Sequence, residues 1–86
     1  MADQFPFDIA IPMAKDVIRK IDQQIVLKRT FPGMAEEENL QTLYEAVGKF
    51  SMTLLKVAFE NPNETSIELL FLINEIGNKI TELKNA

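Results

Sequence analysis

The stretch from Ile67 to Leu83 constrains the fold of this chain more than any other. Its apolar residues recur at gaps of four and three, which places them along one side of an α-helix. They are Leu69, Ile73, Ile76, Ile80 and Leu83. Leu70, Phe71 and Leu72 fill the positions between, so the first half of this helix has no polar face. Such a helix must be covered on all sides, either by the rest of the chain or by another polypeptide.

Two further segments carry a helical pattern. The first begins near Pro12, which suits the first position of a helix because its missing N–H has no partner there anyway. Its apolar stripe is Ala14, Val17, Ile18, Ile21 and Ile25. The sequence Phe31-Pro32-Gly33 ends this helix, since a residue before proline is disfavoured in α geometry and Pro-Gly is typical of a type II turn.

The second helical segment follows a run of three glutamates, whose charge is favourable at a helix N-terminus. Its stripe is Leu40, Leu43, Tyr44, Val47, Phe50, Leu54, Leu55 and Ala58. Gly48 lies in the middle of this pattern at a cost of about 1 kcal/mol relative to alanine. Its presence indicates either a close approach between helices or a local kink.

The third helix is predicted to start with Asn61 as N-cap and Pro62 at the first helical position, or one turn later at a Thr65–Glu68 capping box. Short connections make consecutive helices antiparallel neighbours. The sequence therefore predicts a single all-α domain over residues 1–86. We expect an antiparallel three-helix bundle with helices at about 12–30, 35–60 and 62–84.

Residues 1–11 are predicted to form an extended N-terminal arm. Apolar residues alternate through this region and just beyond it, at Phe5, Phe7, Ile9, Ile11 and Met13. The intervening Pro6 and Pro12 each favour extended geometry in the residue before them. The arm packs either on its own bundle or against the arm of another chain. In the alternative, a helix starts at Pro6, but Pro12 is expected to break it.

Charge is distributed unevenly along the chain, whose net charge is −4. Residues 8–29 carry five basic and three acidic side chains, whereas residues 35–86 carry nine glutamates and four lysines. We interpret this as a surface whose opposite charges help to order the helices. Nucleic acid is not an expected partner, because the overall acidity would repel phosphates.

The composition argues against several classes of protein. The chain has no cysteine, which agrees with a reducing compartment, and the cytoplasm is the expected location. The longest apolar run is too short to cross a bilayer, and we expect no membrane association. With neither histidine nor cysteine, and no glycine-rich phosphate loop, the sequence predicts no enzyme, no cofactor and no catalytic or metal-binding residue.

Apolar residues exceed what a three-helix core of this length can bury. We therefore expect a non-catalytic protein-interaction module that acts through apolar helix faces, as a homodimer or as a subunit of a complex. The predicted interface is Phe50, Met52, Phe59, Phe71 and Leu72. The competing interpretation is that all of these residues fit inside one monomeric core that the arm completes.

Two other functions are consistent with the same sequence. An acidic inhibitor or immunity-type protein could block a basic target with a patch of glutamates. That patch would consist of Glu36, Glu37, Glu38 and Glu45. A small DNA-binding regulator could use the first, more basic helix, with the arm as a dimerising strand.

Overall fold

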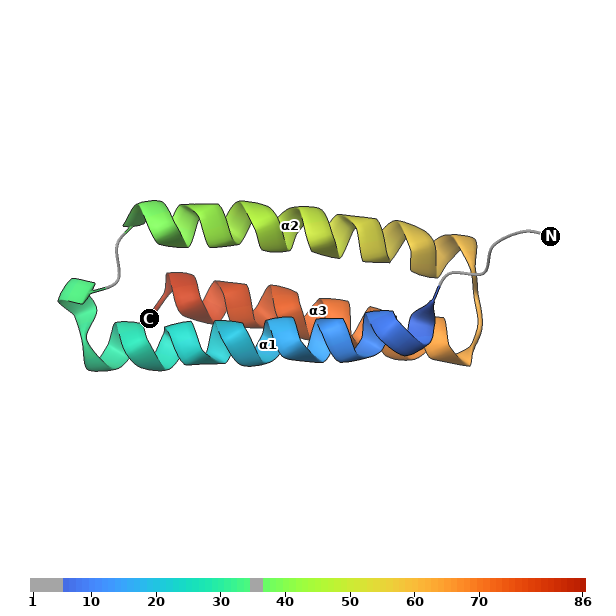
Figure 1. The fold of residues 1–86 in the computed structure, drawn as a ribbon, viewed down its shortest axis with the longest axis horizontal. Coiled ribbons are helices and arrows are strands. Elements are labelled where there is room, and N and C mark those ends of the chain that lie inside the picture. The colour runs from blue at the N-terminus through green and yellow to red at the C-terminus, as the bar shows by residue number, and fades with distance from the viewer. Residues whose placement is uncertain (1–5, 35–36) are drawn as a thin grey trace.

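The computed structural model of the chain describes residues 6–34 and 37–86. Within these ranges it consists of α-helices joined by short connections, without a strand (Figure 1). The elements are α1 (Phe7–Thr30), the 3₁₀ helix η1 (Pro32–Met34), α2 (Glu37–Glu60) and α3 (Glu64–Lys84). The predicted all-α three-helix bundle is confirmed, and its assembly as a dimer stays a prediction.

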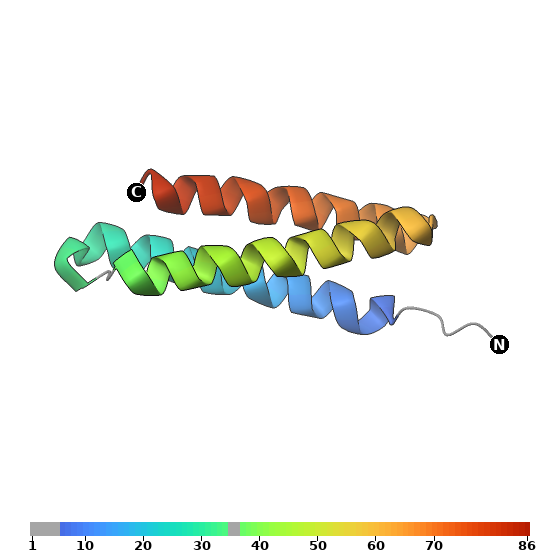
Figure 2. The same ribbon diagram turned by 90° about the horizontal axis from the view of Figure 1, so that it is seen from above.

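The three helices lie side by side in a rod that measures 51 × 20 × 17 Å. α1 and α3 run in the same direction and α2 runs in the opposite one (Figures 1 and 2). α3 packs against both other helices, and its contact with α1 is the more extensive. The apolar C-terminal helix is therefore the element around which the bundle is built.

The core is a set of rows in which buried apolar residues follow one another at intervals of seven or four along each helix. α3 contributes Leu69, Ile76 and Leu83, which are seven residues apart and almost fully buried. The remaining buried apolar residues are Ala10, Ala14, Ile21 and Ile25 of α1 and Leu40, Val47, Leu54 and Ala58 of α2. Repeats of this period place one seam of each helix toward its neighbours, as in coiled-coil packing.

Ion pairs accompany the contact between the parallel helices α1 and α3. Three α1 residues, seven positions apart, each meet an oppositely charged residue of α3. The pairs are Lys15 with Glu68 at 4.0 Å, Asp22 with Lys79 at 2.8 Å and Arg29 with Glu82 at 3.3 Å. The charge of the three α1 residues alternates from positive to negative to positive. The pairs therefore favour one register of α1 on α3.

The predicted extended arm is wrong for residues 7–11, which form the first turns of α1. Pro6 precedes the helix, and its carbonyl accepts hydrogen bonds of 3.0 Å from the N–H groups of Ile9 and Ala10. Pro12 lies inside the helix without ending it. The burial of Ala10 and Ala14 extends the core seam through the proline, and Pro12 itself is exposed to water. Residues 1–5 of the predicted arm lie outside the described residues.

The start of α3 also differs from the prediction. Asn63 is the N-cap, rather than Asn61 or Thr65, and it forms a reciprocal capping box with Ser66. The N–H of Ser66 donates to Asn63 Oδ1 at 2.8 Å, and the N–H of Asn63 donates to Ser66 Oγ at 2.8 Å. At the other connection, Pro32 and Gly33 begin a 3₁₀ helix, and no described glycine has the positive φ that a type II turn requires.

Candidate interaction surface

The five residues of the predicted interface separate into two groups. Met52, Phe59 and Phe71 are 68%, 69% and 72% exposed. Phe50 and Leu72 are half-buried and pack against the core. The first group is available to a partner, whereas the second mainly supports the fold of this chain.

Exposed apolar side chains gather at one end of the bundle. We call this the apolar end and define it by Ile9, Met13, Met52, Phe59, Ile67 and Phe71. They lie in the first turns of α1, the last turns of α2 and the first turns of α3, which meet at the same end of the rod (Figure 1). Val26 and Phe31, which are also exposed, lie toward the opposite end. Single exposed apolar residues are common, but a gathering of this kind is typical of interaction sites.

A groove of about 420 Å³ lies between α2 and α3 and is lined by these two helices only. We call it the α2–α3 groove. Its lining is Tyr44, Val47, Gly48, Ser51, Met52, Leu55, Ile73, Ile76, Gly77, Ile80 and Lys84. The lining is mostly apolar, and Met52 belongs both to the groove and to the apolar end. Met52 is the one residue of the predicted interface that lines the groove, because the groove becomes visible only when the two helices are set side by side.

Lys84 is the one residue among those that line the α2–α3 groove with a formal charge at neutral pH. Its ammonium lies 5.0 Å from the centre of the Tyr44 ring, which is a cation–π distance. This contact connects the last turn of α3 with α2. The rest of the groove is therefore without formal charge.

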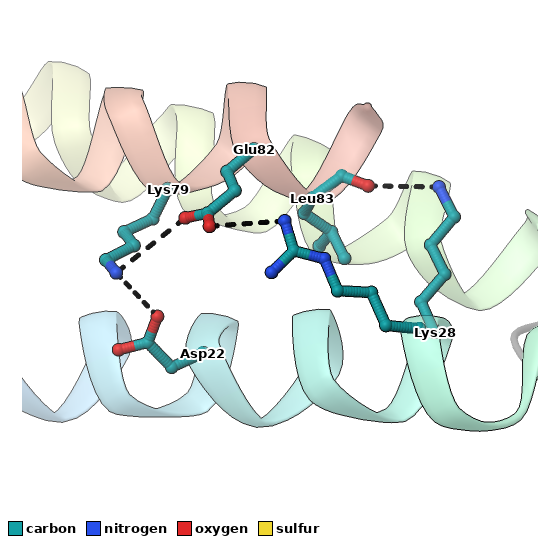
Figure 3. Close-up of polar contacts among 6 residues, drawn as sticks. Asp22, Lys28, Lys79, Glu82 and Leu83 are labelled. Carbon is teal, nitrogen blue, oxygen red and sulfur yellow. Dashed lines mark hydrogen bonds and ion pairs between the residues drawn. The ribbon is translucent and has the colours of Figure 1, made fainter. Parts of the chain in front are cut away.

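Charge is concentrated instead where α1 meets α3. The hydrogen bond from Lys79 Nζ to the Asp22 carboxylate raises the pKa of Lys79, although loss of hydration acts in the opposite direction (Figure 3). On the surface of α1, the ammonium of Lys20 lies 3.1 Å from Asp16 and, together with Arg19, lowers the pKa of that carboxyl. These groups are partly exposed to solvent, and the pair of Lys79 with Asp22 connects α1 with α3.

The structure describes only part of the predicted acidic patch. Glu36 lies outside the described residues, and Glu37 is described only as the first residue of α2. Glu38 and Glu45 are exposed and seven positions apart, which places them on one face of α2. The patch as a functional site stays a prediction.

Across residues 6–34 and 37–86, no three acidic side chains come together in a way that could hold a metal ion. Among the helices described, none has the combination of length and apolar content that crossing a bilayer requires.

Comparisons with known proteins give no match: no family model fits the chain, and no curated protein or solved structure is similar to it.

Proposed function

We propose that this protein is a non-catalytic interaction module that binds another polypeptide through apolar helix faces, as a homodimer or as a subunit of a complex. The observation that carries the proposal is the apolar end, where side chains from all three helices are at least half exposed. Covering them would remove apolar surface from water, at about 25 cal/mol per Å². This gain favours association with a partner.

The residue types at the apolar end agree with this role. Phenylalanine and methionine are enriched in the cores of protein interfaces, and both are present at the apolar end. Phe59 and Phe71 each offer a large ring that adapts to a pocket with little loss of side-chain entropy. The absence of histidine and cysteine from the chain supports the non-catalytic part of the proposal.

Site-specific photo-crosslinking of the full chain in its native host tests the proposal. A photoreactive phenylalanine analogue would replace Phe59 in one variant and Phe71 in another. The matched control carries the same analogue at Thr42, which is exposed on α2 toward the opposite end of the helix. We expect ultraviolet light to give a discrete adduct from position 59 or 71 and none from position 42.

The identity of the adduct need not be known in advance, because mass spectrometry reads it afterwards. An adduct with a second copy of this chain and an adduct with a different protein both support an interaction module. The proposal fails if both apolar positions give no more adduct than Thr42 does. It also fails if all three positions give the same unselective series of adducts with many proteins.

A further inference from the structure

The α2–α3 groove is lined by a second row of residues on each helix. On α2 the row is Tyr44, Gly48, Ser51 and Leu55, and on α3 it is Ile73, Gly77, Ile80 and Lys84. Both rows advance by four, three and four residues, which is the spacing with which helices pack on other helices. Each row lies next to the core row of the same helix. α2 and α3 therefore each carry two rows at helix-packing spacing, one that faces the core of this chain and one that lines the groove.

Gly48 and Gly77 come near the middle of these rows, and both line the groove. A Cβ atom built on either glycine meets nothing within 4 Å, so packing inside this chain does not require a glycine at either position. Glycine is unfavourable inside a helix, and its usual benefit is the close approach of another backbone. The two glycines leave a shallow place in the groove that an incoming helix could enter.

The distribution of charge favours a second copy as the incoming molecule. Each copy has a net charge of −4, so two copies repel one another unless they meet where charge is low. The α2–α3 groove has Lys84 at one end and no acidic residue in its lining. The ion pairs that connect α1 with α3 involve no residue of this lining. At the groove lining itself, contact between two copies therefore brings no acidic side chains together.

Contact along the full length of α2 and α3, beyond the groove lining itself, provides enough area for a dimer. Helices of 24 and 21 residues are roughly 36 and 32 Å long at 1.5 Å per residue. Two of them side by side, each about 10 Å wide, present a face of roughly 650 Å². Two such faces bury on the order of 1,300 Å², which is within the range of specific protein interfaces.

We propose that a second copy of this chain occupies the groove, so that the α2–α3 faces of two copies pack together around Gly48 and Gly77. This inference rests on the proposed function, names a second copy as the partner, and adds the α2–α3 groove, which shares Met52 with the apolar end. Met52, which lines the groove and is 68% exposed, is covered in this assembly. Phe59 lies beside Met52 in a shallow pocket that continues this face.

Sedimentation equilibrium of the full chain tests the inference with the variant Gly77→Gln. The wild type is expected to sediment, at high micromolar concentration, with twice the 9.8 kDa mass of one chain. Gly77→Gln places a side chain where the other copy approaches, and we expect dissociation to become at least roughly tenfold stronger. Circular dichroism should show an intact helical fold, because a Cβ atom at position 77 meets nothing within 4 Å inside one copy.

The matched control is Asn78→Gln, at the exposed neighbouring position that does not line the groove, and it should remain dimeric. If Gly77→Gln does not fold, Gly48→Gln makes the same test from α2. The inference is overturned by a wild type that stays at 9.8 kDa, or by glycine variants that dimerise as the wild type does. A monomeric wild type that still crosslinks from Phe59 to a different protein would leave the proposed function standing.

Discussion

The ammonium of Lys28, in the last turn of α1, donates a hydrogen bond of 3.0 Å to the backbone carbonyl of Leu83 in the last turn of α3 (Figure 3). The last four carbonyls of a helix have no partner inside the helix, and a cation there also meets the negative end of the helix dipole. The contact is possible because α1 and α3 run in the same direction and end side by side. A side chain of one helix thus caps the other.

Replacing Lys28 by methionine should lower the free energy of unfolding by about 1 kcal/mol, because the apolar stem is kept and the hydrogen bond is lost. Urea unfolding followed by circular dichroism measures the change. Lys49→Met, at an exposed position of α2, is the control and should change stability by less than about 0.5 kcal/mol. Equal losses in the two variants would mean that net charge, rather than the cap, is responsible.

The capping box at the start of α3 gives a second prediction. Asn63→Ala removes the acceptor for the N–H of Ser66 and should cost about 1 kcal/mol of stability. Asn61→Ala should cost less, since the Asn61 side chain only donates to the carbonyl of Val57 at the exposed end of α2. Urea unfolding of both variants measures the two losses of stability. A larger loss of stability in Asn61→Ala than in Asn63→Ala would instead support Asn61 as the N-cap, as the sequence predicted.

The long helices could be predicted from the sequence because their apolar periodicity is sustained. The predicted ends near residues 30, 60 and 84 agree with Thr30, Glu60 and Lys84. Phe31-Pro32 follows the first helix and Asn61-Pro62 follows the second, and a proline shortly after a helical pattern is a clear signal for the end of a helix. Sequence pattern fixes such ends well, because each signal depends on neighbouring residues only.

The start of α1 was mispredicted because two patterns of apolar residues overlap there, one alternating as in a strand and one with helical spacing. The alternating apolar residues favoured an extended arm, while Ala10 and Ala14 continue the helical seam of α1. Alanine is a weak hydrophobic signal, so the buried positions Ala10 and Ala14 are hard to recognise in the sequence. Tertiary packing then outweighed the preference of Pro12 for a helix start.

The candidate surface could be predicted only in part. The crowding of apolar residues around Phe71 pointed to side chains that one chain cannot cover, and Phe71 is indeed largely exposed. The α2–α3 groove depends on which residues of α2 and α3 lie beside one another. That relationship is set by the register of two helices, which the apolar pattern of either helix alone does not contain.

The ion pair between Asp22 and Lys79 gives a pH-dependent prediction. Asp22 raises the pKa of Lys79 above its ordinary value of 10.5. A raised folded-state pKa adds stability that is complete below that ordinary value and is lost as the pH rises through the folded-state pKa. The stability difference between the wild type and Asp22→Asn should therefore be constant from about pH 7 to 10 and should shrink above about pH 10.5.

Urea unfolding at each pH measures this difference. Glu38→Gln, which removes an exposed carboxylate of α2, is the control, and its difference from the wild type should not vary in the same window. A constant difference for Asp22→Asn through the alkaline range would show that Lys79 gains nothing from this carboxylate.

Pro12 provides the sharpest test of the helical start of α1. Inside a helix, proline removes one backbone hydrogen bond and its ring crowds the preceding turn, so Pro12→Ala should stabilise the chain by roughly 1 to 3 kcal/mol. Pro62→Ala, between α2 and α3, is the control and should give no gain, because Pro62 lies outside both helices. If Pro12 were the first residue of the helix, its missing N–H would cost nothing and alanine would bring no gain. Urea unfolding that shows Pro12→Ala to be no more stable than the wild type would therefore favour an extended arm over residues 7–11.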